Sequence, residues 1–177
     1  MSSTVDGATY INGVLIVNKT YSLPASYAPG GLTSETQNAF YRLQTAAANA
    51  GYSLWITSGY RSYYDQQTLY NNYVWRDGQA AADRYSARPG HSEHQTGLAI
   101  DVNYAGQAFV GTPESYWLAA NCAEYGFIIR YPDGKEGITG FKYEPWHIRY
   151  VGRDLALALT NSGLTLEEYF GITSQYS

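Results

Sequence analysis

The longest helical pattern in the chain covers residues 34–50. Its apolar side chains fall on one face at helical spacing, at Phe40, Leu43, Ala47 and Ala50. Ser34 and, three residues later, Gln37 match a capping box, and Gly51 is placed to end the helix. These features predict a helix with one buried face over residues 34–50.

Elsewhere, short apolar runs alternate with segments rich in glycine, proline and polar residues. The apolar runs predict strands at residues 10–17, 53–58, 98–103, 127–131 and 146–151. The first run contains Asn12-Gly13, so it could also be part of a hairpin. Helical spacing and capping residues predict further helices at residues 62–75, 79–85 and 113–125, and two short ones after residue 151, the last opened by Thr165 and Glu168. Several connections are too short for helical crossovers, so we expect an α+β fold with a small, mostly antiparallel sheet flanked by helices.

The chain length of 177 residues suits one domain with a real core. Residues 1–9 are polar, so we expect a flexible N-terminal segment followed by a single domain over residues 10–177. No apolar run is long enough for a membrane span, and no signal peptide is visible.

Composition and charge narrow the possible partners. The net charge is −4 and the isoelectric point about 5.3, which argues against a nucleic-acid-binding protein because such proteins normally carry a basic stripe. The single cysteine, Cys122, cannot form an internal disulfide, and we expect it to be buried as a small apolar residue. Nothing indicates an obligate oligomer, so we expect a monomer.

Two of the three histidines and one aspartate suggest a metal site. A catalytic zinc ion takes three protein ligands and keeps one position open. His94 and Asp101 are separated by six residues, and Gly97 permits the sharp turn that would bring the following strand back past His94. Asp101 lies in an apolar run, where an unpaired carboxylate would be costly, and His147 completes the set.

Glu144 lies three residues before His147, with Pro145 between them. A carboxylate next to a metal-activated water is what a metallopeptidase needs as general base. Two alternatives remain at this point: each histidine taken singly could be a core or surface residue, and two histidines with a carboxylate also form the facial triad of non-haem iron oxygenases. The six intervening residues and Glu144 argue against the iron site, and we expect His91 to be a solvated loop residue without a role.

Four segments together resemble the VanY-type zinc carboxypeptidases, a group that includes L,D-carboxypeptidases trimming peptidoglycan tetrapeptides. The segments are SGYRSYYDQQTLY (58–70), ADRYSARPGHSEHQTGLAIDV (82–102), YGFIIRYP (125–132) and EPWHIRYVG (144–152). The resemblance runs from about Val14 to Gly171, and its order of S-x-H-x6-D followed by E-x-x-H is highly specific. It implies a small antiparallel sheet flanked by helices.

The resemblance also implies a role for individual residues. It implies zinc ligands at His94, Asp101 and His147, a catalytic base at Glu144, an oxyanion-stabilising and substrate-contacting arginine at Arg61, and further substrate contacts at Gln66 and Ser92. We give no role to Arg88, although it is close in sequence to the histidines.

The expected function is zinc-dependent removal of the C-terminal D-alanine from peptidoglycan stem peptides. L,D-cleavage of a tetrapeptide is favoured over D,D-cleavage of a pentapeptide, because segment 82–102 looks closest to the L,D branch. The alternatives are a lysin-like endopeptidase on the same scaffold and an inactive wall-binding module. We expect an extracellular or cell-envelope location with the signal or anchor missing from this chain; a cytoplasmic location is the alternative.

Overall fold

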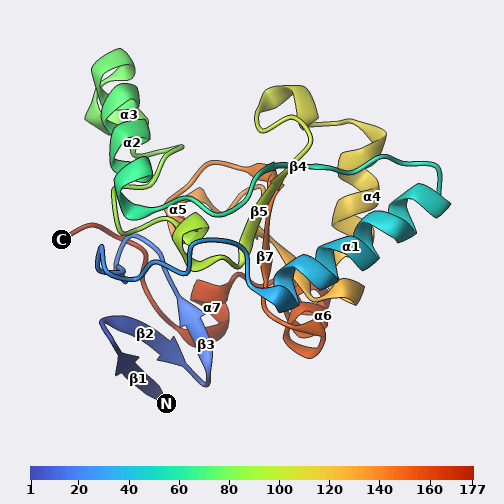
Figure 1. The fold of residues 1–177 in the computed structure, drawn as a ribbon, viewed down its shortest axis with the longest axis horizontal. Coiled ribbons are helices and arrows are strands. Elements are labelled where there is room, and N and C mark those ends of the chain that lie inside the picture. Colours follow the sequence, from blue (N-terminus) through green and yellow to red (C-terminus); the bar gives the residue numbers. More distant parts are fainter.

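The computed structural model describes residues 1–177 and contains two antiparallel sheets (Figure 1). The central sheet has the order β4-β5-β7-β6, with strands at Ile56–Ser58, Ala99–Val102, Glu144–Tyr150 and Phe127–Tyr131. The smaller sheet has the order β1-β2-β3, with strands at Ser2–Val5, Ala8–Ile11 and Val14–Ile16. Every strand pair is antiparallel, which confirms the predicted α+β class, with the strands divided between two sheets.

Helices lie on both sides of the central strands. The α-helices are α1 (Ser34–Asn49), α2 (Tyr63–Asp77), α3 (Gln79–Ala82), α4 (Pro113–Asn121), α5 (Glu136–Thr139), α6 (Arg153–Ser162) and α7 (Leu166–Phe170). Short 3-10 helices are η1 (Glu93–Thr96), η2 (Gln107–Phe109) and η3 (Cys122–Tyr125). In Figure 1, α1 and α4 lie together on one side of β5 and β7, and α2 and α3 lie on the other. None of the helices has the length and hydrophobicity that a membrane crossing requires.

The N-terminal residues carry more regular structure than expected. We expected a frayed segment over residues 1–9, but β1 and the start of β2 lie there and pair with each other. The sequence gives no strand signal for β1, because three of its four residues are polar and all four are exposed. Asn12 and Gly13 form the next turn with positive φ angles of 49° and 80°, as a two-residue hairpin requires.

Helix α1 begins one residue earlier than its sequence signal suggested. Thr33 is the N-cap, and its side-chain oxygen accepts a hydrogen bond from the backbone N–H of Thr36 at 3.1 Å. The predicted capping box of Ser34 and Gln37 is therefore wrong. Thr33 has the extended backbone that a cap needs, whereas Ser34 is the first helical residue.

Alternation along β5 and β7 separates a core face from a functional face. Ile100, Val102 and Ile148 point into the main core, where helices and other strands add Ala39, Phe40, Leu43, Ala47, Leu118, Cys122 and Phe127. Because successive strand residues point to opposite faces, Asp101 and His147 point away from this core. A second core joins β3, η3, β6, α6 and α7 through Ile16, Ala123, Ile128, Ala156, Leu159 and Leu166.

Candidate metal centre and active site

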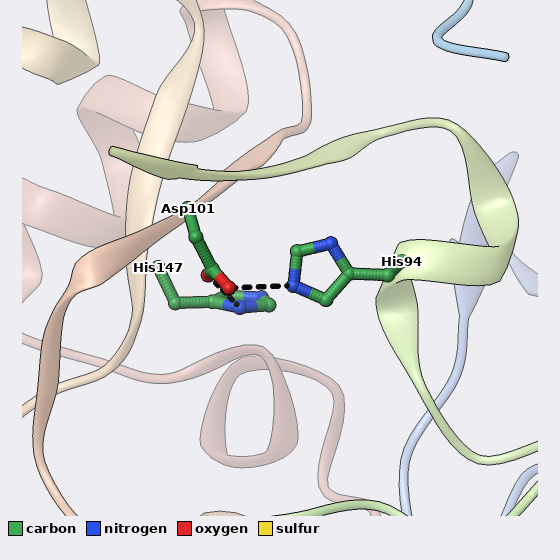
Figure 2. A group of neighbouring side chains, drawn as sticks. All are labelled: His94, Asp101 and His147. Atoms are coloured by element: carbon green, nitrogen blue, oxygen red, sulfur yellow. Dashed lines mark hydrogen bonds and ion pairs between the residues drawn. The ribbon is translucent and has the colours of Figure 1, made fainter. Parts of the chain in front are cut away.

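Three buried side chains converge on one point of the functional face. Asp101 on β5 lies directly opposite His147 on β7 in the strand register, so the two side chains are cross-strand neighbours. His94 approaches from η1, and Figure 2 shows all three side chains pointing toward one another. The exposed fraction is 4% for each histidine and 8% for Asp101, so the group is nearly closed to solvent.

Gly97 makes the return from η1 to β5 possible. Its φ of 74° is left-handed, and it caps the C-terminal end of η1. A Cβ atom at this position would lie 2.5 Å from the carbonyl oxygen of Gly31. Both the backbone conformation and the close approach therefore require glycine at the turn expected here from the sequence.

The hydrogen bonds of the two histidines leave one ring nitrogen of each directed to the centre. His94 Nδ1 lies 2.7 Å from the Gly59 carbonyl oxygen, to which it can only donate. His147 Nε2 lies 3.1 Å from Glu93 Oε1. His94 Nε2 and His147 Nδ1 each lie 3.1 Å from a different oxygen of Asp101. A metal ion bound between these groups would take the lone pairs of the two nitrogens, and the proton of each neutral ring would then lie on the nitrogen that faces Gly59 or Glu93.

The arrangement fits a zinc ion. The ligand atoms of His94, Asp101 and His147 all lie within 4.8 Å of one another. Tetrahedral ligands about 2.1 Å from zinc are roughly 3.4 Å apart, so small side-chain movements would complete the site. Two imidazole nitrogens and a carboxylate are also a typical donor set of catalytic zinc, which leaves a fourth position for water.

Asp101 and His147 shift each other's pKa values toward their charged forms. Burial would raise the pKa of Asp101, but His94 and His147 hold this pKa well below its usual range. Burial would lower the pKa of His147, but hydrogen bonds to Asp101 and Glu93 raise it to about 10. A metal ion must therefore displace a proton from His147 when it binds.

Glu144 is the first residue of β7 and is half-buried beside the three ligands. Burial raises its pKa to about 8, although the positive charge of His147 opposes this rise. A carboxyl group whose pKa is close to neutral suits a group that accepts and returns a proton. The general-base role expected from the sequence stays a prediction.

All the residues expected at the site line one cavity of about 480 Å³. Its walls include Arg61, Gln66, Ser92, His94, Asp101, Glu144 and His147, with aromatic side chains from Tyr73, Tyr85, Tyr131, Phe141, Tyr143 and Trp146. A cavity of this size, mostly apolar with a few convergent polar groups, is typical of a small-ligand site.

Hydrogen bonds hold the expected substrate-contacting residues in place. Arg61 donates to Gln66 Oε1 and to Ser58 Oγ, both at 2.8 Å. Gln66 is 2% exposed, and its amide nitrogen donates to the Ala87 carbonyl at 2.8 Å, so its amide orients Arg61. Ser92 caps η1 by accepting the His94 backbone N–H at 3.2 Å, which leaves its own hydroxyl proton free to donate.

His91 and Arg88 lie outside this cavity. His91 is not the solvated residue that we expected: it is half-buried, with Nδ1 2.9 Å from the Asn18 carbonyl and its ring 5.0 Å from that of Tyr176. Arg88 pairs with Asp83 at 2.9 Å and packs over the Tyr176 ring. The C-terminal segment thus covers both residues, and no local sequence signal indicated this contact.

Sequence reasoning missed two residues that touch His147. Glu93 contacts the ring nitrogen facing away from the centre, and the Tyr131 ring lies 4.8 Å from the imidazole at an angle of 38°. One sequence signal could have indicated Glu93: its carboxylate lies directly between Ser92 and His94, two residues that were expected at the site.

Comparison with known proteins gives consistent results. A family model described as VanY, D-alanyl-D-alanine carboxypeptidase, matches residues 30–153. YodJ of Bacillus subtilis (strain 168), to which a carboxypeptidase activity is ascribed, is 40% identical over 194 residues, which cover 94% of this chain and 71% of YodJ.

Solved structures share the fold along most of the chain. The LdcB LD-carboxypeptidase is 41% identical with a TM-score of 0.91, and the match covers 100% of this chain and 98% of LdcB. The vancomycin-resistance D,D-pentapeptidase VanY, solved in complex with Zn(II), is 36% identical with a TM-score of 0.77 over 87% of this chain and 96% of that one. The residues brought together at the cavity and these matches show that the chain belongs to the VanY family of D-alanyl-D-alanine carboxypeptidases.

Proposed function

We propose that the protein is a zinc carboxypeptidase that removes the C-terminal D-alanine from peptidoglycan stem peptides. The observation that carries this proposal is the convergence of His94, Asp101 and His147 beside Glu144 in one cavity. His94 Nε2, the Asp101 carboxylate and His147 Nδ1 would hold the ion, since their other polar contacts leave these atoms available. The bound ion would act as a Lewis acid and acidify a water molecule.

Glu144 would move the proton during hydrolysis. It takes a proton from the attacking water as the water oxygen bonds to the scissile carbonyl carbon. It then gives that proton to the nitrogen of the departing D-alanine as the C–N bond breaks. Its half-buried side chain lines the cavity together with His147, so the carboxyl group can reach a bound peptide.

Arg61 would stabilise the negative charge that develops on the carbonyl oxygen. Its guanidinium is already fixed by Ser58 and Gln66, so it need not be ordered at the moment of reaction. The Ser92 hydroxyl, which also lines the cavity, would donate a hydrogen bond to the peptide.

The preferred bond is proposed to be the L,D bond of a tetrapeptide. Support comes from the more complete match to the LD-carboxypeptidase LdcB, which covers 100% of this chain against 87% for the D,D-pentapeptidase VanY. An endopeptidase on the same scaffold is the alternative, and it differs in requiring no free carboxyl group next to the scissile bond. An inactive wall-binding module is less well supported, because ligands and base are all present.

The substrate set that tests this proposal contains a stem tetrapeptide, a stem pentapeptide and a tetrapeptide with an amidated C-terminus. We expect the zinc-loaded protein to release D-alanine from the free tetrapeptide faster than from the pentapeptide, and to spare the amide. Faster pentapeptide cleavage would reverse the L,D assignment. Equal cleavage of the amidated peptide would indicate an endopeptidase.

We further propose that the protein acts on its substrate in the cell envelope as a monomer. The LdcB LD-carboxypeptidase, with which this chain shares its fold, is described as recognising peptidoglycan. Size-exclusion chromatography with light scattering would test the oligomeric state, and fractionation of the source cells would test the location.

A further inference from the structure

Glu93 divides its two carboxylate oxygens between different tasks. Oε1 lies 3.1 Å from His147 Nε2. Oε2 alone accepts from both neighbouring arginines, from Arg130 Nε at 2.7 Å and from an Arg149 terminal nitrogen at 2.8 Å. A carboxylate that served only to neutralise these arginines could face them with both oxygens, so the orientation of Oε1 toward His147 calls for a separate explanation.

The surroundings of Glu93 fix this orientation. Glu93, Arg130, Arg149 and Glu167 are each 1% exposed, and the two carboxylates balance the two guanidiniums. Arg130 donates to both oxygens of Glu167, at 2.7 and 2.6 Å. Arg149 also donates to the Leu15 carbonyl at 2.7 Å. Every charge in this buried cluster is therefore paired, and Glu93 cannot rotate without unpairing an arginine.

We propose that Glu93 is a positioning residue, which keeps the proton of His147 on Nε2 and thereby presents the Nδ1 lone pair to the metal. The inference rests on the zinc site of the proposed function and deepens it. A carboxylate beyond a histidine ligand fixes the tautomer and orientation of the ring and increases its basicity. Arg130 and Arg149 complete the arrangement, because they hold Glu93 itself.

The substitution Glu93→Gln keeps the size of the side chain but changes the hydrogen bond to His147. It therefore separates the positioning of His147 from the filling of space by residue 93. The arginines can only donate, so the amide oxygen of Glu93→Gln would turn toward Arg130 and Arg149. Its NH₂ group would then face His147 Nε2 and donate to it. That hydrogen bond favours the opposite tautomer, with the proton on Nδ1, where the metal must bind.

The matched control is Glu167→Gln. Glu167 has the same burial, pairs with Arg130 and accepts a hydrogen bond from the Asn18 amide, but it has no hydrogen bond to His147. Both substitutions remove one buried charge from the same cluster, so both should lower the free energy of unfolding. Only Glu93→Gln should weaken zinc binding, by about 10- to 100-fold in a chelator competition.

A second measurement needs no substitution in the cluster. Ring-nitrogen NMR of the zinc-loaded, ¹⁵N-histidine-labelled protein reports which nitrogen of each histidine carries a proton. We expect His147 to carry it on Nε2 and His94 on Nδ1. The signals of His91 are assigned by their loss in His91→Gln, which lies outside the cavity.

The outcomes separate the two proposals. Absence of zinc binding by the wild-type protein would overturn the proposed function itself. Two results would overturn the role of Glu93 alone. One is zinc binding by the wild type together with equal zinc affinities of Glu93→Gln and Glu167→Gln. The other is a zinc-loaded His147 that is protonated on Nδ1. If Glu93→Gln does not fold, a zinc-loaded wild-type His147 protonated on Nδ1 would still overturn the role of Glu93.

Discussion

Individual side chains at the cavity are fixed before any substrate arrives. Arg61 is held by Ser58 and Gln66, and the backbone of Gly59 orients His94. Preorganised groups of this kind stabilise charge without a cost of reorganisation during the reaction. The geometry of a few fixed donors, more than the shape of the whole cavity, therefore determines the chemistry that we propose.

Replacing Arg61 by lysine should separate charge from geometry. Lysine keeps one positive charge but cannot donate to Ser58 and Gln66 in the same fork, so the charge would lose its fixed position. We expect kcat for D-alanine release to fall by about 10²–10³-fold with zinc content unchanged. Arg76→Lys, an exposed arginine paired with Asp77, is the control and should match the wild type. Unchanged kcat in Arg61→Lys would contradict the role of Arg61.

His91 should make the stability of the protein depend on pH. Burial lowers the pKa of His91, although its hydrogen bond to the Asn18 carbonyl opposes the shift. The unfolded chain therefore binds a proton near its usual pKa of about 6.5 while the folded chain does not, and stability falls as the pH drops through that range. Urea unfolding of the wild type and His91→Gln between pH 7.5 and 5.5 measures this. The variant should lose less stability on acidification, and identical slopes would show that His91 does not contribute.

At the scale of elements, strand register and one tight turn build the metal centre. The pairing of β5 with β7 places Asp101 opposite His147, and Gly97 returns the chain so that η1 delivers His94. Because all three ligands come from two short segments and one strand pair, the sequence could indicate them from spacing and residue type alone. The same local information could not place the N-cap of α1, since Thr33 and Ser34 are both competent caps.

Two single substitutions test the position of that cap. Thr33→Ala removes the oxygen that accepts the Thr36 N–H, so the free energy of unfolding should fall by about 1 kcal/mol. Ser34→Ala should have little effect, because Ser34 is already inside the helix. Chemical denaturation of both variants gives the comparison. A larger loss in Ser34→Ala would restore the cap predicted from the sequence.

At the scale of the whole molecule, segments far from the site in the sequence contact the residues around it, and no local sequence pattern indicates these contacts. Glu93 meets Arg130 and Arg149, and Tyr176 covers His91. These contacts join segments far apart in the sequence, so no local pattern indicates the role of Glu93 or the burial of His91. Fold class, the convergence of His94, Asp101 and His147, and the apolar helix face could be predicted because their signals are periodic or local. The second sheet could not, because β1 is polar and exposed.

Zinc should stabilise the whole domain, because its proposed ligands join η1, β5 and β7. A ligand at about 100 times its Kd adds about 2.7 kcal/mol to the free energy of unfolding. For a domain of this size, that corresponds to a rise in Tm of roughly 5–10 °C. Thermal unfolding with zinc and with a chelator measures the shift. Asp101→Asn, which weakens a ligand, should show a much smaller shift, and a zinc-independent Tm in the wild type would contradict the site.

The most direct test of the proposed enzyme is mass spectrometry of a peptidoglycan stem tetrapeptide after incubation with the zinc-loaded protein. Glu144→Gln, loaded with zinc to the same occupancy, serves as the matched control, because it keeps the size of the side chain but cannot accept the proton. We expect the wild type to release one D-alanine and leave a tripeptide, and the variant to be slower by about 10²–10⁴-fold. An intact tetrapeptide with the zinc-loaded wild type, or equal release by Glu144→Gln, would contradict the proposed mechanism.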